Sequence, residues 1–282
     1  MSRLLVTHLL GSLSTLIIVS IGPKTSESAR VFTIVNGCRT TIWPAVTPGE
    51  SFNGGGFVLK PGQSTVFTAP TGWSGRIWGR TGCRFDGAGH GSCETGGCGE
   101  VLQCEAAGKP PASLAEFTLT SPTGDYYDVS LVDGFNLPMA VRPLNGRGNC
   151  TVAGCDRDLR LSCQSELSLR VASRTVACRS ACDVFNTDEY CCRGVFGNPL
   201  TCRPSFYSKA FKAACPTAYC YAYDDPASIF TCSAADYVVT FCSPRSQPVR
   251  TYHDKRGSAS VAGERWGTTV LLVLVGLILS RV

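Results

Sequence analysis

The stretch VFTIVNGC at positions 31–38 is a short run of β-forming residues that ends in an Asn-Gly pair and a cysteine. β-Branched and aromatic residues bounded by glycine are typical of a strand. A second such run, VVTFC at 238–242, lies near the other end of the chain. If the two strands pair, Cys38 and Cys242 lie close enough to form a disulfide that spans nearly the whole chain. In the chain-entropy account, closing such a long loop is worth on the order of 4–5 kcal/mol.

Further short runs between positions 40 and 135 show the same alternating character. They are TTIWPAV (40–46), GGFVLKPGQSTVF (55–67), GRIWGRTGC (75–83), AEFTLTS (115–121) and YYDVSLVDGF (126–135). Glycine, proline and asparagine separate these runs, which is typical of an all-β sandwich. We therefore expect a sandwich core formed by residues 30–149 and 233–245.

The cysteine-dense region 150–232 has a different character. DRDLRLSCQSELSLR (156–170) and SFYSKAFKAAC (205–215) both show helical spacing of apolar residues, with Ser205 as a candidate N-cap. Cys178 and Cys182 are four residues apart, which would place them on one helix face. The pattern predicts a helical, disulfide-rich satellite inserted before the last strand.

Composition restricts the class of protein. The chain has 282 residues, 17 cysteines, three histidines and a formal net charge of +5. Such a density of cysteines is typical of an oxidising compartment, where disulfides persist. A metal site is the competing interpretation, but no pair of CxxC units occurs at zinc spacing. We expect no metal, no cofactor and a monomer, and the small positive balance gives no nucleic-acid signal.

Both ends of the chain carry targeting patterns. Arg3 and the apolar stretch after it predict a signal peptide over residues 1–28. After a linker at 246–258, residues 259–282 end in an apolar run whose helix would rise only about 15 Å, half of a bilayer core. This favours a removed GPI-anchor signal with attachment at Ser258. A short membrane anchor and a vacuolar-type propeptide are the alternatives.

Several longer motifs carry a family likeness. They are GHGSCETGGC (89–98), PPASLAEFTL (110–119), YDVSLVDGFNLPM (127–139), NTDEYCCRG (186–194) and AYCYAYDDPASIFTC (218–232). Through them the chain resembles plant thaumatin-like proteins, the fifth class of pathogenesis-related proteins, within a domain at 29–245. The resemblance implies a mainly β fold: a thaumatin-like β-sandwich with a disulfide-rich helical satellite domain and a small loop domain.

The resemblance also implies how the cysteines pair, which their spacing alone does not select. The implied disulfides are Cys38–Cys242, Cys83–Cys93, Cys98–Cys104, Cys150–Cys232, Cys155–Cys215, Cys163–Cys178, Cys182–Cys191 and Cys192–Cys202. Cys220 stands where the family usually has serine and is left as a free thiol. We expect this thiol to be buried and inert, and pairing between chains is the alternative.

In many members of this family, one arginine and four carboxylates line a cleft between the sandwich and the helical part. The matching residues here are Arg76, Glu116, Asp128, Asp133 and Asp224. Crowding of carboxylates raises at least one pKa, and the arginine offsets part of the repulsion. The resemblance makes Glu116 the candidate acid and Asp133 the candidate base for cleavage of β-1,3-glucan. A structural ion-pair network is the alternative.

Binding without cleavage is the interpretation that we favour. Tyr127, Phe135 and Tyr223 flank the candidate cleft residues in sequence and offer aromatic faces to sugar rings. Carboxylates accept protons from sugar hydroxyls. We therefore expect a secreted antifungal defence protein, lipid-anchored at the outer face of the plant plasma membrane or held in the cell wall. Its expected partner is β-1,3-glucan or a related wall polysaccharide.

Three other functions stay open at this point: an endo-β-1,3-glucanase, a membrane-perturbing protein, and a structural wall or receptor-partner protein. Unless the protein is membrane-perturbing, we expect it to contact the membrane only through its lipid anchor. Asn149 begins the sequence Asn-Cys-Thr, which makes it a candidate glycosylation site.

Overall fold

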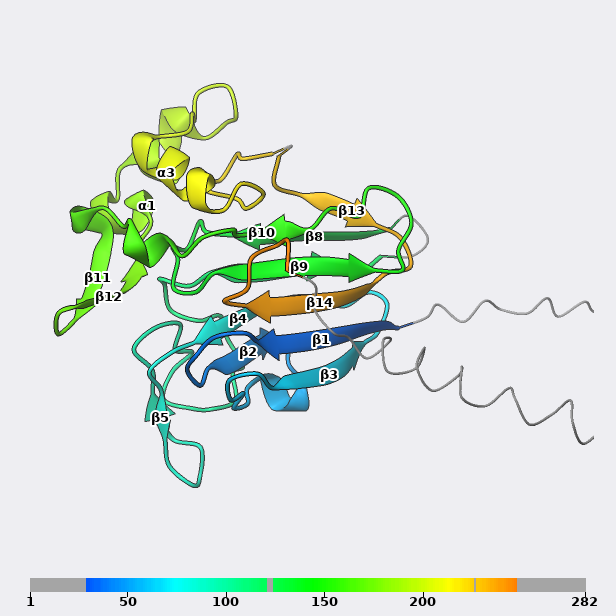
Figure 1. Ribbon diagram of the computed structural model, residues 1–282. Coiled ribbons are helices and arrows are strands. Elements are labelled where there is room, and N and C mark those ends of the chain that lie inside the picture. Colours follow the sequence, from blue (N-terminus) through cyan, green and yellow to red (C-terminus); the bar gives the residue numbers. More distant parts are fainter. Residues whose placement is uncertain (1–28, 121–123, 226, 248–282) are drawn as a thin grey trace, which may run out of the picture.

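The structure of the protein, a computed structural model, describes residues 29–120, 124–225 and 227–247 (Figure 1). The predicted signal peptide, nearly all of the predicted linker, Ser258 and the predicted anchor signal lie outside these residues. Its regular secondary structure is mainly β, in two five-stranded sheets and two short two-stranded ones.

The first sheet has the strand order β10-β9-β14-β1-β3. Its strands are β10 (Ala153–Gly154), β9 (Met139–Leu144), β14 (Asp236–Phe241), β1 (Arg30–Asn36) and β3 (Ser64–Ala69). β1 runs parallel to β14, with Phe32 opposite Tyr237 and Asn36 opposite Phe241. The predicted pairing of the first and last long strands is therefore present, and the Cα atoms of Cys38 and Cys242 lie 4.8 Å apart in a disulfide.

The second sheet has the strand order β13-β8-β7-β4-β2 and lies behind the first in Figure 1. Its strands are β13 (Phe230–Cys232), β8 (Asp125–Ser130), β7 (Leu114–Thr118), β4 (Ser74–Arg80) and β2 (Trp43–Thr47). Aromatic rings from both sheets meet in the core, where Phe32 packs edge-on against Phe117 at 4.9 Å and stacks on Tyr237 at 5.4 Å. The two faces bury a common core, so the predicted mainly β sandwich is confirmed.

A charged network joins the two sheets inside this core. The Asp125 carboxylate of β8 accepts bonds from Arg30 Nε of β1 at 2.7 Å and from the Tyr237 hydroxyl of β14 at 3.0 Å. The backbone N–H of Thr120 donates to the same carboxylate at 3.1 Å. Asp125 is completely buried and Arg30 nearly so. Because Arg30, Tyr237 and Thr120 all donate to it, the buried charge of Asp125 is compensated by groups from both sides of the core.

The helical part lies between the sandwich strands β10 and β13. It contains α1 (Ala181–Phe185), α2 (Asp188–Cys191), α3 (Phe206–Ala214), the hairpin β11 (Ser168–Val171) and β12 (Arg174–Cys178), and the 3₁₀ turns η2 (Leu159–Leu161), η3 (Ser165–Leu167) and η4 (Gly194–Phe196). The predicted helix at 205–215 is confirmed as α3, and the Ser205 side chain accepts a bond from Ser208 N. A further 3₁₀ turn, η1 (Asn53–Gly55), lies in the sandwich.

Three predictions for the helical part differ from the structure. Residues 156–170 form no helix but two 3₁₀ turns and most of β11, and Leu161, which a helical apolar face would bury, is 88% exposed. The Asp158 side chain accepts a bond from Arg160 N, a local turn that competes with helix. Cys178 and Cys182 share no helix face, because Cys178 ends β12. The range 150–232 is also not purely a satellite, since β10 and β13 belong to the sandwich sheets.

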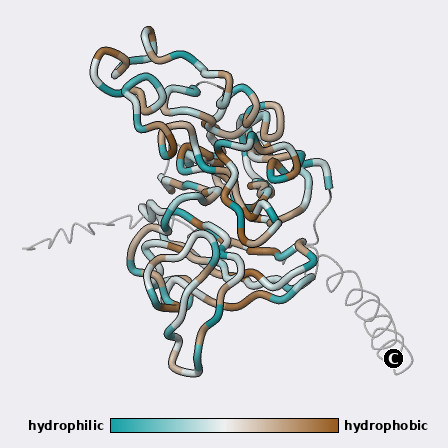
Figure 2. Tube along the Cα trace, turned by 90° about the vertical axis from the view of Figure 1, so that its left-hand side faces the viewer, coloured by the Kyte–Doolittle hydropathy of each residue, from teal (hydrophilic) through white to brown (hydrophobic). Residues whose placement is uncertain are grey.

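The small loop part carries the hairpin of β5 (Arg84–Phe85) and β6 (Gly91–Ser92). Arg80, at the end of β4, is fully buried and ties this part to the sandwich. Its guanidinium donates to the carbonyls of Trp43, Val101 and Leu102 at 3.0, 3.2 and 2.7 Å. Burial lowers the pKa of Arg80 to about 10. Figure 2 views the molecule from the end where β1 and β14 finish, with the helical part above and this hairpin below.

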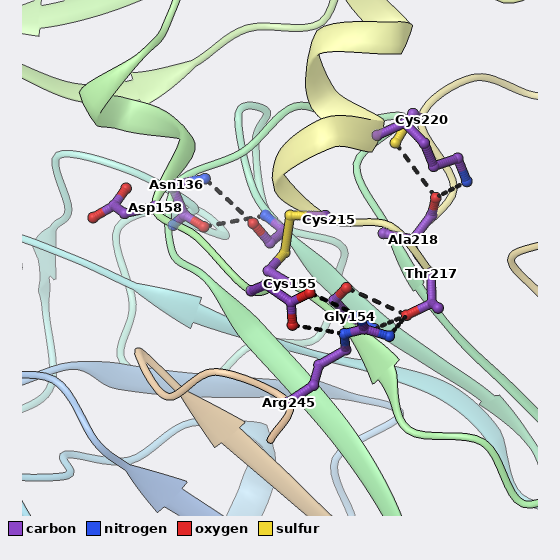
Figure 3. The surroundings of a disulfide bond; sticks show 12 residues. Asn136, Gly154, Cys155, Asp158, Cys215, Thr217, Ala218, Cys220 and Arg245 are labelled. Carbon is purple, nitrogen blue, oxygen red and sulfur yellow. Dashed lines mark hydrogen bonds and ion pairs between the residues drawn. A yellow bond between two sulfur atoms is a disulfide. The ribbon is translucent and has the colours of Figure 1, made fainter. Parts of the chain in front are cut away.

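Eight disulfides are present, and they join the same pairs that the family resemblance implies. These are Cys38–Cys242, Cys83–Cys93, Cys98–Cys104, Cys150–Cys232, Cys155–Cys215, Cys163–Cys178, Cys182–Cys191 and Cys192–Cys202. Cys220 is free and buried, and its thiol donates to Ala218 O at 3.4 Å (Figure 3). Burial raises the pKa of this thiol to about 12, which keeps it protonated and unreactive at neutral pH.

The buried network predicts an unequal effect of two aspartate substitutions. We expect Asp125→Asn to lower the free energy of unfolding by about 3–5 kcal/mol, because it removes the buried carboxylate that the Arg30 guanidinium and the Tyr237 hydroxyl bind. The control is Asp183→Asn, which breaks the partly exposed ion pair between Arg179 and Asp183 of α1 and should cost less than about 1 kcal/mol. Urea unfolding with the disulfides intact measures both changes. Equal losses would contradict a special role for Asp125.

Candidate functional site

Three of the predicted cleft residues form a row across the second sheet. Arg76 in β4 lies opposite Glu116 in β7, and Glu116 lies opposite Asp128 in β8. Their sequence neighbours Ile77 and Val129 are completely buried in the core. Because successive side chains of a strand point to opposite faces, the row stands on the outer face of the sheet.

A groove covers this row. Two adjoining hollows of about 500 and 400 Å³ are both lined by Arg76, Glu116 and Asp128, so we treat them as one feature, the acidic groove. Tyr126 lines one of the hollows, and Tyr219 of the helical part lines the other. The groove therefore extends from the sandwich toward the helical part.

The charges of Arg76 and Glu116 are paired across the strands. An Nη atom of Arg76 lies 3.2 Å from Glu116 Oε1, and each side chain is about one third exposed. Burial raises the pKa of Glu116, the positive charge of Arg76 lowers it, and the nearby Asp133 raises it again. The net direction is upward, so Glu116 holds a proton more readily than an ordinary glutamate.

Asp128 is the most perturbed carboxyl of the row. Burial raises its pKa to about 8, with further contributions from the charges of Glu116 and Asp225, and Arg76 opposes the rise. Among the described residues, none hydrogen-bonds the buried Oδ1 atom of Asp128. The carboxyl is therefore protonated at neutral pH and has hydrogen-bonding capacity left for a group that enters the groove.

Asp133 lines the end of the groove near the helical part, in the loop that follows β8. Burial raises its pKa, Arg76 lowers it, and Asp183 of α1 raises it. Four of the five predicted cleft residues, Arg76, Glu116, Asp128 and Asp133, thus meet around one groove.

Asp224, the fifth predicted cleft residue, does not line the acidic groove. The predicted placement of Asp224 in the cleft is therefore corrected. Its side chain is buried, lies 2.7 Å from Lys212 Nζ of α3 and accepts a bond from Cys220 N at 2.8 Å. The ion pair and the backbone bond give Asp224 a structural role in holding the 218–228 loop on α3. Asp225 is exposed, accepts a bond from the Tyr219 hydroxyl and adds to the field at Asp128.

The prediction of which aromatic residues flank the site also needs correction. Tyr127 and Phe135 are buried in the core, and Tyr223 lines neither hollow of the groove. The aromatic ring beside Asp128 is Tyr126, which is 44% exposed. Residues two apart in a strand share a face, so the alternation in YYDVS could have identified Tyr126 once Asp128 was placed outside.

The candidate glycosylation residue Asn149 is exposed in the loop before β10. Its Oδ1 atom accepts a bond from Thr151 Oγ1 at 3.0 Å. The cysteine between them is bonded to Cys232. The side chain is thus accessible, and its modification stays a prediction.

Within residues 29–120, 124–225 and 227–247, no group of three His, Cys, Asp or Glu side chains is placed to hold a metal ion. None of the helices in those ranges combines the length and the apolar character needed to cross a bilayer.

The raised pKa of Asp128 predicts a pH dependence of stability. Between about pH 4 and 8 the folded protein keeps a proton on Asp128 that the unfolded chain releases, since an unperturbed aspartate has a pKa near 3.9. The stabilisation from this proton is complete below about pH 4 and is lost as the pH rises through 8. We expect Asp128→Asn to remove this pH-dependent stabilisation. The urea midpoint of the variant should then fall less than that of the wild type between about pH 4 and 8.

Asp188→Asn is the control for that experiment, because Asp188 is an exposed carboxylate of α2 outside the groove. Its midpoint should follow the wild-type pH profile. A wild-type slope in the Asp128→Asn protein would show that Asp128 carries no extra proton in the folded state.

Comparisons with known proteins place the chain in a family. The model of the thaumatin family matches residues 36–243. Pathogenesis-related thaumatin-like protein 3.5 of Cryptomeria japonica is 54% identical over 234 residues, covering 82% of this chain and 97% of the relative. Pathogenesis-related protein 5 of Arabidopsis thaliana is 50% identical over 236 residues, covering 83% and 98%. The solved thaumatin-like xylanase inhibitor is 26% identical with a TM-score of 0.44, covering 75% of this chain and 98% of the inhibitor. The chain belongs to the thaumatin family.

Proposed function

We propose that the protein is an extracellular plant defence protein whose acidic groove binds β-1,3-glucan. The observation that carries the proposal is the row of Arg76, Glu116 and Asp128 on the floor of an open groove with an exposed aromatic ring beside it. The names of the relatives in Cryptomeria and Arabidopsis support a role in defence. Eight disulfides support a location outside the cytosol.

The chemistry of the groove suits a neutral sugar chain. The Glu116 carboxylate can accept protons from sugar hydroxyls, and a protonated Asp128 can also donate one. Tyr126 and Tyr219 stand on different hollows of the groove and offer apolar ring faces to pyranose rings. A groove open along its length admits the middle of a polymer, so no chain end is needed for binding.

The tether at the cell surface is a further part of the proposal. It rests on the small residues around Ser258 and the short apolar run before the C-terminus. Release of the protein from intact cells by a phosphatidylinositol-specific phospholipase would support it, and retention after that treatment would contradict it.

Binding should depend on the aromatic ring in the groove. We expect Tyr126→Ala to weaken retention on linear β-1,3-glucan about fivefold to tenfold, because loss of one aromatic contact costs about 1 kcal/mol. Phe206→Ala is the matched control, since Phe206 is 71% exposed on α3 and lines neither hollow. Affinity electrophoresis in gels that contain the glucan measures both variants. A wild-type protein that migrates unretarded would overturn the proposal.

Hydrolysis of the glucan is the second candidate function, and one observation favours it. A carboxyl that holds its proton at neutral pH, Asp128, lies next to a carboxylate that is paired with arginine, Glu116. A proton donor beside a charged carboxylate is the arrangement that glycoside cleavage uses. This geometry shifts the candidate acid from Glu116 to Asp128.

Reducing-end release from linear β-1,3-glucan separates the two functions. If the protein is an enzyme, Asp128→Asn should lower turnover by at least about a hundredfold, the usual contribution of general acid catalysis, and Glu116→Gln should also reduce it. If the protein only binds, wild type and both variants release no ends while the wild type is retained on the glucan. Turnover that survives Asp128→Asn would remove Asp128 as the acid.

A further inference from the structure

A second groove lies at the end of the first sheet, away from the row on the second sheet. Its volume is about 740 Å³, larger than either hollow of the acidic groove. It is lined by the chain that leaves β1, by the chain that leaves β14 and by the hairpin strand β12 of the helical part. This end of the molecule faces the viewer in Figure 2. We call it the arginine groove, because Arg39, Arg157, Arg160 and Arg174 all line it.

The carboxylates of the arginine groove are already paired. Asp158 binds Arg160 at 2.6 Å, Asp156 binds Arg245 at 2.7 Å, and Glu94 lies 3.8 Å from Arg174. Arg245 also donates to Thr217 Oγ1 beside the Cys155–Cys215 disulfide, as Figure 3 shows. Each negative charge in the lining is therefore neutralised by one arginine.

Two cations remain after this pairing. Arg39 and Arg157 are exposed, and no carboxylate of the described residues lies within ion-pair distance of either. Arg157 lies near enough to Asp156 to lower the pKa of that carboxyl, but the main bond of Asp156 is to Arg245. The groove thus carries two guanidinium groups whose planar donor forks are available to a ligand.

The rest of the lining has the character of a sugar site. Trp43 lines the groove and is partly exposed, and Thr41 and Thr175 bring hydroxyl groups to the lining. Cys38, Cys155 and Cys242 also line the groove, and each is in a disulfide. The walls are therefore covalently held, so a ligand need not order them on binding.

We propose that the arginine groove binds a linear polyuronate, a polysaccharide with a carboxylate on each sugar. The guanidinium forks of Arg39 and Arg157 match carboxylates, and the Trp43 face and the threonine hydroxyls match sugar rings. The acidic groove would repel the same polymer, so the two grooves differ in the sign of charge that they accept. The proposal does not depend on what the acidic groove binds.

The test uses the disulfide-bonded protein and polygalacturonate at low salt. We expect Arg39→Gln with Arg157→Gln to weaken binding by at least about tenfold, because each charge-assisted bond lost usually costs about a factor of ten. The double variant should also show a smaller dependence of affinity on salt, since fewer counterions are released from the polyanion. Both residues are exposed, and unchanged urea midpoints will show that the variant is folded.

The matched control is Arg84→Gln with Arg147→Gln, which removes two exposed arginines that do not line the groove. It should bind polygalacturonate like the wild type. Equal weakening in the control pair would overturn the proposal, because binding would then follow net charge alone. The proposal is also overturned if the wild type does not bind polygalacturonate, or if it binds the fully methyl-esterified polymer equally well. Inorganic polyphosphate that binds as tightly through the same two arginines would overturn it as well.

Discussion

The buried carboxylate of Asp125 is the interaction on which the geometry of the site depends. It holds Arg30 and Tyr237 of the first sheet against β8 of the second. Because Asp125 must point inward, alternation along β8 directs Tyr127 and Val129 to the core and Tyr126 and Asp128 to the outside. A shift of one residue would bury the groove carboxyl and expose the charge that joins the sheets. The core network thus fixes both the sandwich and the face that carries the site.

The acidic groove brings together effects that oppose one another. Partial burial disfavours charge on every carboxyl of the row, and the like charges of neighbours add to this. A single arginine, Arg76, relieves Glu116 by direct contact and Asp128 only from a distance. The result is two adjacent carboxyls of unequal proton affinity, although the two side chains would have similar pKa values in water. Such inequality allows one groove to offer both an acceptor and a donor to hydroxyl groups.

The sequence predicted the sandwich because its strands carry strong local signals and because the first and last long strands each lead to a cysteine. It placed Arg76, Glu116 and Asp128 on one groove through a family likeness, and strand pairing brings them there. Asp224 was misplaced because no local pattern reveals that Lys212 of α3 reaches it. The helix predicted at 156–170 failed for a related reason, since a disulfide and a side-chain turn override the helical spacing there. The arginine groove gave no sequence signal, because its lining residues come from distant segments.

The parallel pairing of β1 with β14 also has a consequence for how the protein is made. Among the strands of the described residues, β1 is synthesised first, yet its parallel partner β14 is synthesised last. Until then one edge of β1 stays unpaired, and such an edge is a site for association with other chains. The first sheet therefore completes only after synthesis of the domain is nearly finished, and the late strand must find β1 while that edge is still open to other chains.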